Sequence, residues 1–151
     1  MQIEHSKRQF LRTAGIAAAA AVIAPRMAFA SPTEVAAEIK KLYGDKKMDS
    51  GRIKLDVPQI AENGLVVPIN VEVESPMSAT DYVKSVHVYA ERNPLPSVVT
   101  YRFTPEAGKA SASTRMRLAE TQDIVVVAEM SNGQLFTTKS EVKVTIGGCG
   151  G

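Results

Sequence analysis

Residues 124–146 read IVVVAEMSNGQLFTTKSEVKVTI, and this stretch decides the fold. Its first part, Ile124 to Met130, is an almost continuous apolar run with the length of one strand. Ser131-Asn132-Gly133-Gln134 comes next, and Asn-Gly readily takes the positive φ values of a type I′ turn. The chain then returns as a second strand, whose last apolar residues are Val142, Val144 and Ile146. The stretch therefore predicts a β-hairpin.

Alternation of apolar and polar residues extends the strand pattern toward the N-terminus. The alternating segments are 67–73, 86–91, 99–103 and 110–118, and 53–57 adds one more strand. With the hairpin this makes about seven strands, with turns at intervals of about eight to twelve residues and one apolar face on each strand. We expect an all-β fold, an immunoglobulin-like antiparallel β-sandwich.

A short helix is expected before the strands. Ser31-Pro32-Thr33-Glu34 combines a Ser N-cap, a Pro at the first helical position and the Glu of a capping box. Val35, Ile39 and Leu42 then recur at helical spacing, and Gly44 ends the run. This pattern predicts one amphipathic N-terminal helix of about three turns.

Composition excludes several classes of protein. The 151 residues are 44% hydrophobic and 23% charged, which is ordinary for one globular domain. One Cys and two His form neither an internal disulfide nor a Cys/His cluster, so zinc and iron–sulfur sites are excluded. The net charge of +2 is too small for a nucleic-acid surface, and the apolar runs are too short for a stable membrane span.

The first 30 residues are typical of an export signal. Basic residues precede a short apolar stretch, Ala14 to Pro25, and Ala28-Phe29-Ala30 is an A-x-A cleavage site. We expect residues 1–30 to be removed and the mature protein to be periplasmic. Ser6-Lys7-Arg8-Gln9-Phe10-Leu11 resembles a twin-arginine signal with Lys in place of the first Arg, which leaves the twin-arginine and general secretion routes both open.

Removal of this segment changes the charge and the histidine count. Four of the 18 basic residues and one of the 16 acidic residues lie in residues 1–30, so the mature net charge is −1. His5 is also lost, which leaves His87 as the only histidine. The basic character of the full chain therefore says nothing about the partners of the mature protein.

The sequence closes with Ile146-Gly147-Gly148-Cys149-Gly150-Gly151, where four glycines surround the only cysteine. Glycines offer no side chain to pack, so we expect residues 147–151 to form a flexible, swinging arm on a carrier domain of residues 31–146. The stretch from Ile146 to Cys149 spans roughly 10 Å when extended. Cys149 could then enter a narrow pocket, which suits a group carrier that presents cargo to several enzymes.

Other roles of Cys149 compete with the carrier role. A buried, inert thiol fits poorly with its glycine neighbours, whereas an intermolecular disulfide in a structural or binding module stays open as the alternative. A catalytic thiol needs a lowered pKa from a helix N-terminus, a base or a cation, and the tail offers none. We therefore expect a thiol that other enzymes load, and not an enzyme.

The segment Val144-Thr145-Ile146-Gly147-Gly148-Cys149-Gly150-Gly151, on an exported β-sandwich, resembles the SoxY family, the sulfur-carrying subunits of the SoxYZ complex of bacterial thiosulfate oxidation. Three internal parts are similar to the family as well: 58–64 followed by Val67-Pro68, Asn93-Pro94 with Pro96, and 114–119. The resemblance covers nearly the whole chain. It implies that thiosulfate-derived sulfur is held covalently on Cys149 and that this chain has no cofactor of its own.

The resemblance also implies partners. A SoxZ-like β-sandwich subunit is expected to form a heterodimer with this chain. A c-type cytochrome complex would couple thiosulfate oxidatively to Cys149 as an S-thiosulfonate, and a separate hydrolase would release sulfate. A molybdenum–haem sulfane dehydrogenase, where present, would oxidise the remaining persulfide sulfur. No nucleic-acid or membrane partner is implied.

Other residues carry weaker functional hypotheses. His87 could be a general base, but its spacing places no Ser, carboxylate or second His beside it, so a surface or interface position is expected. Arg115 and Arg117 share a strand face and could bind an anionic sulfur adduct, whereas a solvated or partner-facing strand is the simpler explanation. Glu62-Asn63-Gly64 predicts a turn. The methionines that share no spacing, and for which loop or core positions are expected, are Met48, Met77, Met116 and Met130.

Overall fold

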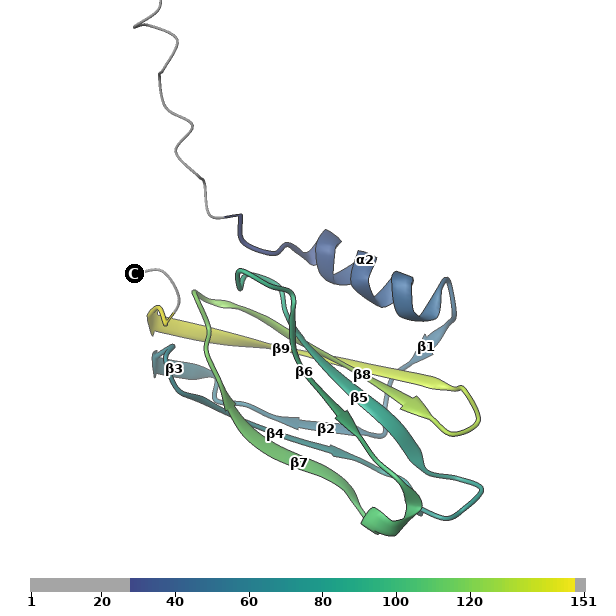
Figure 1. Cartoon of the computed structure of the whole chain (residues 1–151). Coiled ribbons are helices and arrows are strands. Elements are labelled where there is room, and N and C mark those ends of the chain that lie inside the picture. Colours follow the sequence, from purple (N-terminus) through teal and green to yellow (C-terminus); the bar gives the residue numbers. More distant parts are fainter. Residues whose placement is uncertain (1–27, 149–151) are drawn as a thin grey trace, which may run out of the picture.

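The computed structural model describes residues 28–148 as two β-sheets packed face to face, with an α-helix on the outer side of one sheet (Figure 1). Predictions on residues 1–27 and on Cys149, Gly150 and Gly151 lie outside the described residues. The larger sheet has the strand order β1 (Met48–Asp49), β9 (Leu135–Ile146), β8 (Gln122–Met130), β5 (Val83–Ala90) and β6 (Ser97–Arg102), and β3 (Ile60–Asn63) also pairs with β9. The smaller sheet has the order β2 (Ile53–Asp56), β4 (Val67–Val73) and β7 (Ala110–Met116). A short 3-10 helix, η2 (Pro105–Ala107), precedes β7.

The predicted all-β sandwich with a short N-terminal helix is confirmed, but two strands differ from the expected pattern. Among the described residues there are nine strands, and the additional ones, β1 and β3, both pair with β9 in the parallel direction. These strands have two and four residues, which is too short for alternation to show. Their partner lies far along the chain, so no local pattern could indicate the pairing.

The core lies between the two sheets and follows the alternation in the sequence. Strand β4 buries every second residue and leaves Pro68 and Asn70 exposed on the outer face. Strands β5 and β8 supply the facing layer. The buried side chains from these three strands include Val67, Ile69, Val71, Val73, Val86, Val88, Ile124 and Val126. This apolar layer is the interior of the sandwich.

Strand β8 is buried on both faces, which explains its almost continuous apolar run. Ile124 and Val126 face the core, whereas Val125 and Val127 pack in a second cluster with helix α2 (Pro32–Tyr43). Figure 1 shows α2 lying along the outer side of the larger sheet. A strand covered by a second sheet on one face and by a helix on the other has no polar face to show.

Helix α2 begins and ends as predicted, although its apolar face is rotated. The Ser31 side chain accepts the Glu34 N–H (3.3 Å), and Gly44 follows the last turn with a φ of 65°. The expectation that Leu42 packs is wrong: its side chain is 54% exposed, and Tyr43 packs beside Ile39 in its place. No helix within residues 28–148 is long and apolar enough to cross a membrane.

The β8–β9 hairpin is confirmed, but its turn type is not the expected one. The Met130 carbonyl accepts the Gly133 N–H (3.0 Å), so the turn begins at Met130. Gly133 has a φ of 84°, whereas Asn132 is not among the described residues with positive φ. The arrangement is a turn followed by one left-handed glycine, as in hairpins with a glycine bulge, and not a type I′ turn.

Candidate functional site at the end of strand β9

The end of β9 extends beyond its partner β8 and is held by two connecting segments. Residues 143–146 pair with β3, and the Lys143 N–H donates to the Gln59 carbonyl (3.0 Å). The next amide, that of Val144, donates to Oγ1 of Thr121 in the segment that joins β7 to β8 (2.9 Å). Successive N–H groups of a strand point to opposite sides, so the last part of β9 is held from both sides.

Three backbone hydrogen bonds continue this arrangement past the strand. The Gly64 N–H donates to the Ile146 carbonyl (2.7 Å), the Leu118 N–H to the Gly64 carbonyl (2.8 Å), and the Gly148 N–H to the Leu118 carbonyl (2.8 Å). They connect the turn after β3, the segment after β7 and the first residues of the tail, residues 147–151. We call Gly64, Leu118 and Ala119 the tail clamp.

Three glycines at the tail clamp, Gly64, Gly147 and Gly148, have no room for a side chain. A Cβ at Gly148 would overlap the carbonyl of Gly64, and a Cβ at Gly147 would overlap the carbonyl of Ala119. A Cβ at Gly64 would overlap the Leu118 carbonyl and lie 2.8 Å from the amide nitrogen of Gly148. None of these glycines has a positive φ, so close approach, and not backbone conformation, requires the absence of a side chain.

Gly147 and Gly148 lie against the sandwich in this structure, whereas the flexible arm over residues 147–151 stays a prediction. The Gly148 amide is hydrogen-bonded, and both residues lie against backbone atoms of the tail clamp. Glycine favours disorder only where nothing approaches it, whereas here it allows three segments to meet. Cys149 lies outside the described residues, but its Cα is about 3.8 Å from that of Gly148 by covalent geometry.

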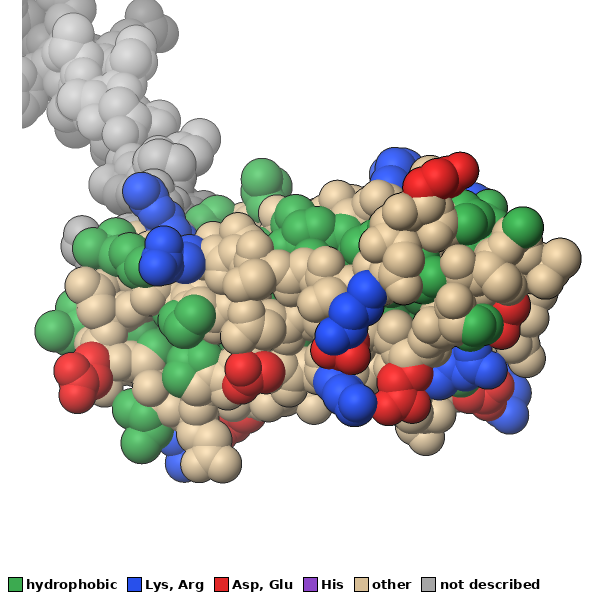
Figure 2. Space-filling model, turned by 90° about the horizontal axis from the view of Figure 1, so that it is seen from below, with side chains coloured by type: hydrophobic (Ala, Val, Ile, Leu, Met, Phe, Trp, Pro, Cys, Tyr) green, Lys and Arg blue, Asp and Glu red, His purple; other side chains and the backbone are tan. Residues whose placement is uncertain are grey.

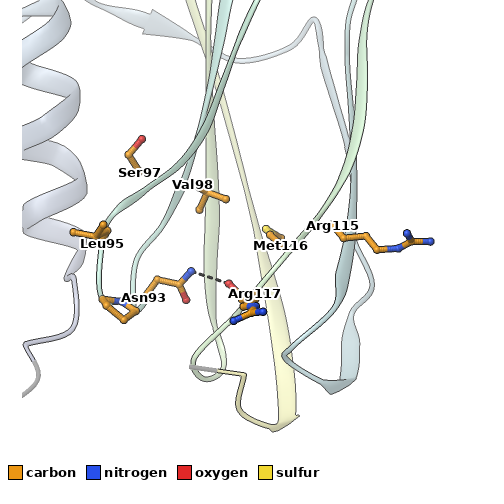
Figure 3. Close-up of a pocket in the computed structure, with 8 residues that line it drawn as sticks. Asn93, Leu95, Ser97, Val98, Arg115, Met116 and Arg117 are labelled. Atoms are coloured by element: carbon orange, nitrogen blue, oxygen red, sulfur yellow. Dashed lines mark hydrogen bonds between the residues drawn. The ribbon is translucent and has the colours of Figure 1, made fainter. Parts of the chain in front are cut away.

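Asn93, in the loop between β5 and β6, supports the tail clamp from beneath. Its side chain is buried, and its Nδ2 donates to the Arg117 carbonyl (2.8 Å; Figure 3). Its Oδ1 accepts the Ala119 N–H (3.0 Å) and the side-chain amide of Gln122 (3.0 Å). The two backbone groups that Asn93 holds lie on either side of Leu118, so Asn93 fixes the residue whose carbonyl binds Gly148.

Arg115 and Arg117 lie near the tail clamp without forming a joint site. A surface groove of about 420 Å³ is lined by residues of the β5–β6 loop and by both arginines. In Figure 3 the Arg115 side chain extends away from Asn93, whereas Arg117 lies beside it. Neither arginine makes an ion pair within the described part of the chain. Both arginines therefore line the groove, but only Arg117 adjoins the tail clamp, since it directly precedes Leu118.

Apolar side chains surround the tail clamp at the surface. Leu65 and Val66 follow Gly64 directly and are 46% and 58% exposed, and Ile146 is 66% exposed. Figure 2 shows hydrophobic side chains gathered at the end of the molecule next to the grey atoms. Farther from the grey atoms, Figure 2 shows acidic and basic side chains close together. The ion pairs of the smaller sheet and its neighbouring residues include Lys54–Glu74 and Lys109–Glu72.

His87 does have neighbours that its spacing was not expected to supply. Nε2 lies 3.3 Å from Oγ of Ser85, and Nδ1 lies 3.1 Å from Oγ1 of Thr100. The Ser85 hydroxyl also donates to the Glu129 carboxylate (3.3 Å). The order is carboxylate, hydroxyl, imidazole, whereas a nucleophile triad requires the imidazole in the middle. Ser85 is also buried, so these residues do not form a hydrolytic site.

Burial beneath helix α2 shifts the pKa values of His87 and of the two tyrosines beside it. It lowers the pKa of His87, with a further contribution from the positive charge of Arg102, while Glu129 opposes the shift. Burial also raises the pKa of Tyr43, and it raises the pKa of Tyr89 to about 12. The Tyr43 ring meets the imidazole edge-on and the Tyr89 ring stacks on it. His87 is therefore a neutral packing residue between the larger sheet and α2.

The remaining candidates are structural. Met77, Met116 and Met130 are buried in the core and Met48 packs near α2, which confirms the expected loop and core positions. The turn predicted at 62–64 lies further along the chain: Glu62 and Asn63 end strand β3, and the turn begins at Gly64. The Leu65 N–H there donates to Oδ1 of Asn63 (2.9 Å). No group of three or more His, Cys, Asp or Glu side chains that could hold a metal lies within residues 28–148.

The three internal segments named above as similar to the family meet at this one end of the sandwich. Residues 58–64 supply β3 and Gly64, residues 93–96 supply Asn93, and residues 114–119 supply Leu118 and Ala119. No sequence pattern offered a reason to choose Asn93 as a functional candidate. The local pattern around Asn93-Pro94 does not distinguish a buried side chain with several hydrogen bonds from an ordinary exposed loop residue. Only the tertiary hydrogen bonds show its role.

These features define a class: a small two-layer β-sandwich that holds the base of a cysteine-containing C-terminal tail by backbone contacts. Comparison with known families adds a more specific result, because residues 39–149 match the family described as sulfur oxidation protein SoxY. The chain belongs to the SoxY family. The matched stretch includes Cys149.

Solved structures agree with this assignment. The sulfur carrier protein SoxY from Chlorobium limicola f thiosulfatophilum is 31% identical, covers 77% of this chain and 100% of its own, and has a TM-score of 0.64. Superoxide reductase (neelaredoxin) from Ignicoccus hospitalis is 15% identical over 77% of this chain and 94% of its own, with a TM-score of 0.56. The latter likeness shows the shared fold alone. No curated protein matches the chain.

Proposed function

We propose that this protein is a periplasmic sulfur carrier that holds thiosulfate-derived sulfur covalently on Cys149. The observation that carries the proposal is the family match, which runs to residue 149 and so includes the cysteine. The similar structure from Chlorobium limicola f thiosulfatophilum is that of a sulfur carrier protein. The tail clamp is consistent with the proposal, because it binds Gly148, the residue before the cysteine in sequence, at the end of the sandwich.

The proposed loading step is an oxidative coupling. The Cys149 thiol and thiosulfate form an S–S bond, the thiol proton leaves, and two electrons pass to the haems of a c-type cytochrome complex. The product is a cysteine S-thiosulfonate. Water then attacks the terminal sulfonate sulfur in a separate hydrolase, which releases sulfate and leaves a persulfide on Cys149. A sulfane dehydrogenase, where present, oxidises that remaining sulfur.

The protein itself contributes the tether and the recognition surface, and not the chemistry. In the proposed role the partner activates the thiol of Cys149, because a thiol reacts as its thiolate. The electrons leave through the partner's haems, so the role needs no cofactor in this chain. A SoxZ-like β-sandwich subunit completes the proposed carrier as a heterodimer.

Periplasmic location belongs to the same proposal. Its support is the N-terminal sequence, which has a basic start, a short apolar stretch and the A-x-A site at 28–30. Thiosulfate would then meet the carrier outside the cytoplasm, where c-type cytochromes also act. The export route, twin-arginine or general secretion, does not affect the carrier role.

Reconstitution of thiosulfate oxidation with the host's partner proteins tests the proposal. With Cys149→Ser, we expect cytochrome reduction by thiosulfate to vanish while the variant keeps the wild-type melting temperature and still assembles with the SoxZ-like subunit. Turnover by Cys149→Ser would contradict the carrier role. Loss of assembly in the variant would instead support the alternative, in which Cys149 forms a structural intermolecular disulfide.

A further inference from the structure

We infer that folding of the sandwich covers the expected export cleavage site, so that residues 28–31 have to leave the surface before a signal peptidase can cut between Ala30 and Ser31. The inference rests on the proposed export of the chain and is independent of Cys149. It concerns the precursor, the full chain before cleavage, in which Ala28-Phe29-Ala30 is the A-x-A site. The cut is a hydrolysis: water adds across the Ala30–Ser31 bond and leaves a carboxylate on Ala30 and an amino group on Ser31.

Ala30, whose carbonyl group would be attacked, is held against the loop between β5 and β6. Its N–H donates to the carbonyl of Asn93 (2.7 Å), and the residue is only 6% exposed. Asn93 is itself fixed, because its side chain forms three hydrogen bonds, two with backbone groups after β7 and one with the side chain of Gln122. Ala30 is therefore attached to a firmly held part of the sandwich, whereas Ala28 and Phe29 are exposed.

Ser31, on the other side of the bond to be cut, is held by helix α2. Its side chain accepts the Glu34 N–H (3.3 Å) and its carbonyl accepts the Val35 N–H (3.0 Å), so Ser31 is the N-cap of the helix. Val35 is 3% exposed and packs in one cluster with Tyr89 of the larger sheet. The bond is thus fixed on both sides, and no slack chain lies between the two points of attachment.

A peptidase needs a different arrangement of these residues. A protease that binds its substrate as an extended strand pairs with the backbone around the bond to be cut and takes side chains into pockets. Both the side chain and the N–H of Ala30 are occupied by the sandwich. Cleavage therefore depends on the population of a locally opened form, in which residues 28–31 and the first turn of α2 have detached.

The Ala30–Asn93 contact links the rate of maturation to the folding state of the precursor. A chain that meets the peptidase unfolded has its cleavage site exposed, whereas a chain that is already folded has to open first. Both export routes lead to the same product, but the folded chain reaches it more slowly. The Ala30–Asn93 hydrogen bond is lost after the cut, so it belongs to the precursor alone.

An insertion of Gly-Ser-Gly-Ser between Ala30 and Ser31 separates the cleavage site from α2 and changes no residue of the sandwich. The A-x-A site is kept, and the flexible insertion gives it the slack to reach a peptidase. The matched control has the same insertion between Asn132 and Gly133, in the exposed β8–β9 turn, and keeps the contacts of Ala30. A synthetic peptide of residues 24–36 is too short to fold and reports whether the uncovered site is recognised.

The folded precursors and the peptide are incubated with purified signal peptidase in detergent micelles. Melting temperatures establish that the precursors are folded, and intact mass follows cleavage after Ala30. We expect the peptide and the insertion variant to be cut readily, and the wild-type and control precursors to be cut about tenfold or more slowly than the insertion variant. Hydrogen exchange by NMR should show the Ala30 amide protected in the wild-type precursor and exchanging freely in the peptide.

The inference is overturned if the folded wild-type precursor is cut as fast as the insertion variant, or if its Ala30 amide exchanges as freely as in the peptide. It is also overturned if the insertion variant resists as strongly as wild type while the peptide is cut, or if the folded control is cut as fast as the insertion variant. If neither the peptide nor any precursor is cut after Ala30, the proposed export signal fails. The Ala30 exchange result then still decides whether the sandwich holds residues 28–31.

Discussion

Gly64 lets three segments of the backbone meet because it has no side chain. Its N–H bonds to Ile146 and its carbonyl to Leu118, and a Cβ would overlap the Leu118 carbonyl. Glycine is often associated with flexibility, and the tail glycines Gly147 and Gly148 invite the same interpretation from sequence. Here all three are sites of close packing. The residue type is the same in both cases, and only the surroundings decide its role.

Gly64→Ala should destabilise the protein by about 1–3 kcal/mol, because the new methyl group has to displace backbone atoms. Urea denaturation followed by circular dichroism measures the change. Leu65→Ala is the control, since Leu65 is the exposed neighbour and its replacement should stay within about 0.5 kcal/mol. Equal stabilities of Gly64→Ala and wild type would show that the close approach is not present in solution.

His87 gives the stability of the sandwich a defined pH dependence. Burial and the charge of Arg102 lower the pKa of His87, and the opposing effect of Glu129 is smaller. The unfolded chain therefore binds the proton more readily than the folded protein. Stability is therefore full above the unfolded value of 6.5 and falls as the pH drops below it toward the folded value. The pKa of Glu129 is raised by burial but lowered overall by hydrogen bonds and the charge of Lys84, so its effect is lost only below 4.5.

We expect the free energy of unfolding to decrease between pH 7.5 and pH 5.5, values that bracket the ordinary histidine pKa of about 6.5. His87→Gln, which cannot titrate, should show little change over the same range. Urea titrations at both pH values measure this. Because His87 is the only histidine after residue 30, no other imidazole can account for a difference. A wild-type protein more stable at the lower pH would contradict the buried neutral state.

At the scale of elements, strands with a clear alternation were predictable, and strands that depend on a distant partner were not. β4 and β7 follow their apolar patterns residue by residue. β3 has four residues and one buried side chain, Ala61, and it exists because β9 runs beside it. Parallel pairing across more than eighty residues leaves no local signal, as Ile60↔Lys143 illustrates.

The hairpin shows where turn rules reach their limit. Asn-Gly correctly predicted a reversal between β8 and β9, because glycine at 133 can take a positive φ. The sequence did not specify whether the turn would start at Met130 or Ser131, since that choice depends on the register of two strands. That register is fixed by the burial of both faces of β8, which involves α2 and the smaller sheet.

Gly133→Ala should cost about 1–2 kcal/mol, because a side chain is strained at a φ of 84°. Thermal unfolding measures the loss as a lower melting temperature. Gln134→Ala, the exposed neighbour, is the control and should change stability by less than about 0.5 kcal/mol. No loss in Gly133→Ala would mean that the turn adopts another conformation in solution.

At the scale of the whole molecule, the sandwich supports the end of β9 and the first residues of the tail. Its core holds β9, and the residues that contact Gly147 and Gly148 or support those contacts come from three separate parts of the chain. The candidate cysteine was recognisable from its place in the sequence. The support for it was not, because Asn93 and Gly64 act through contacts that exist only in the folded protein.

The proposed carrier role leaves the chemistry to partner proteins, so the protein should need no metal to fold. We expect an excess of EDTA to leave the melting temperature and the far-UV circular dichroism spectrum unchanged. Within residues 28–148, no three His, Cys, Asp or Glu side chains are grouped so that they could hold a metal ion. A clear drop in melting temperature with EDTA, reversed by a divalent cation, would contradict this expectation.

The central claim is that sulfur is held covalently on Cys149, and intact mass spectrometry tests it most directly. The protein is taken from the periplasm of its host grown on thiosulfate and measured with and without a reductant. We predict a chain that begins at Ser31 and carries reductant-sensitive sulfur or thiosulfonate adducts on the C-terminal peptide, absent in Cys149→Ser. A bare thiol, or only a disulfide between proteins, during active thiosulfate consumption would contradict the account.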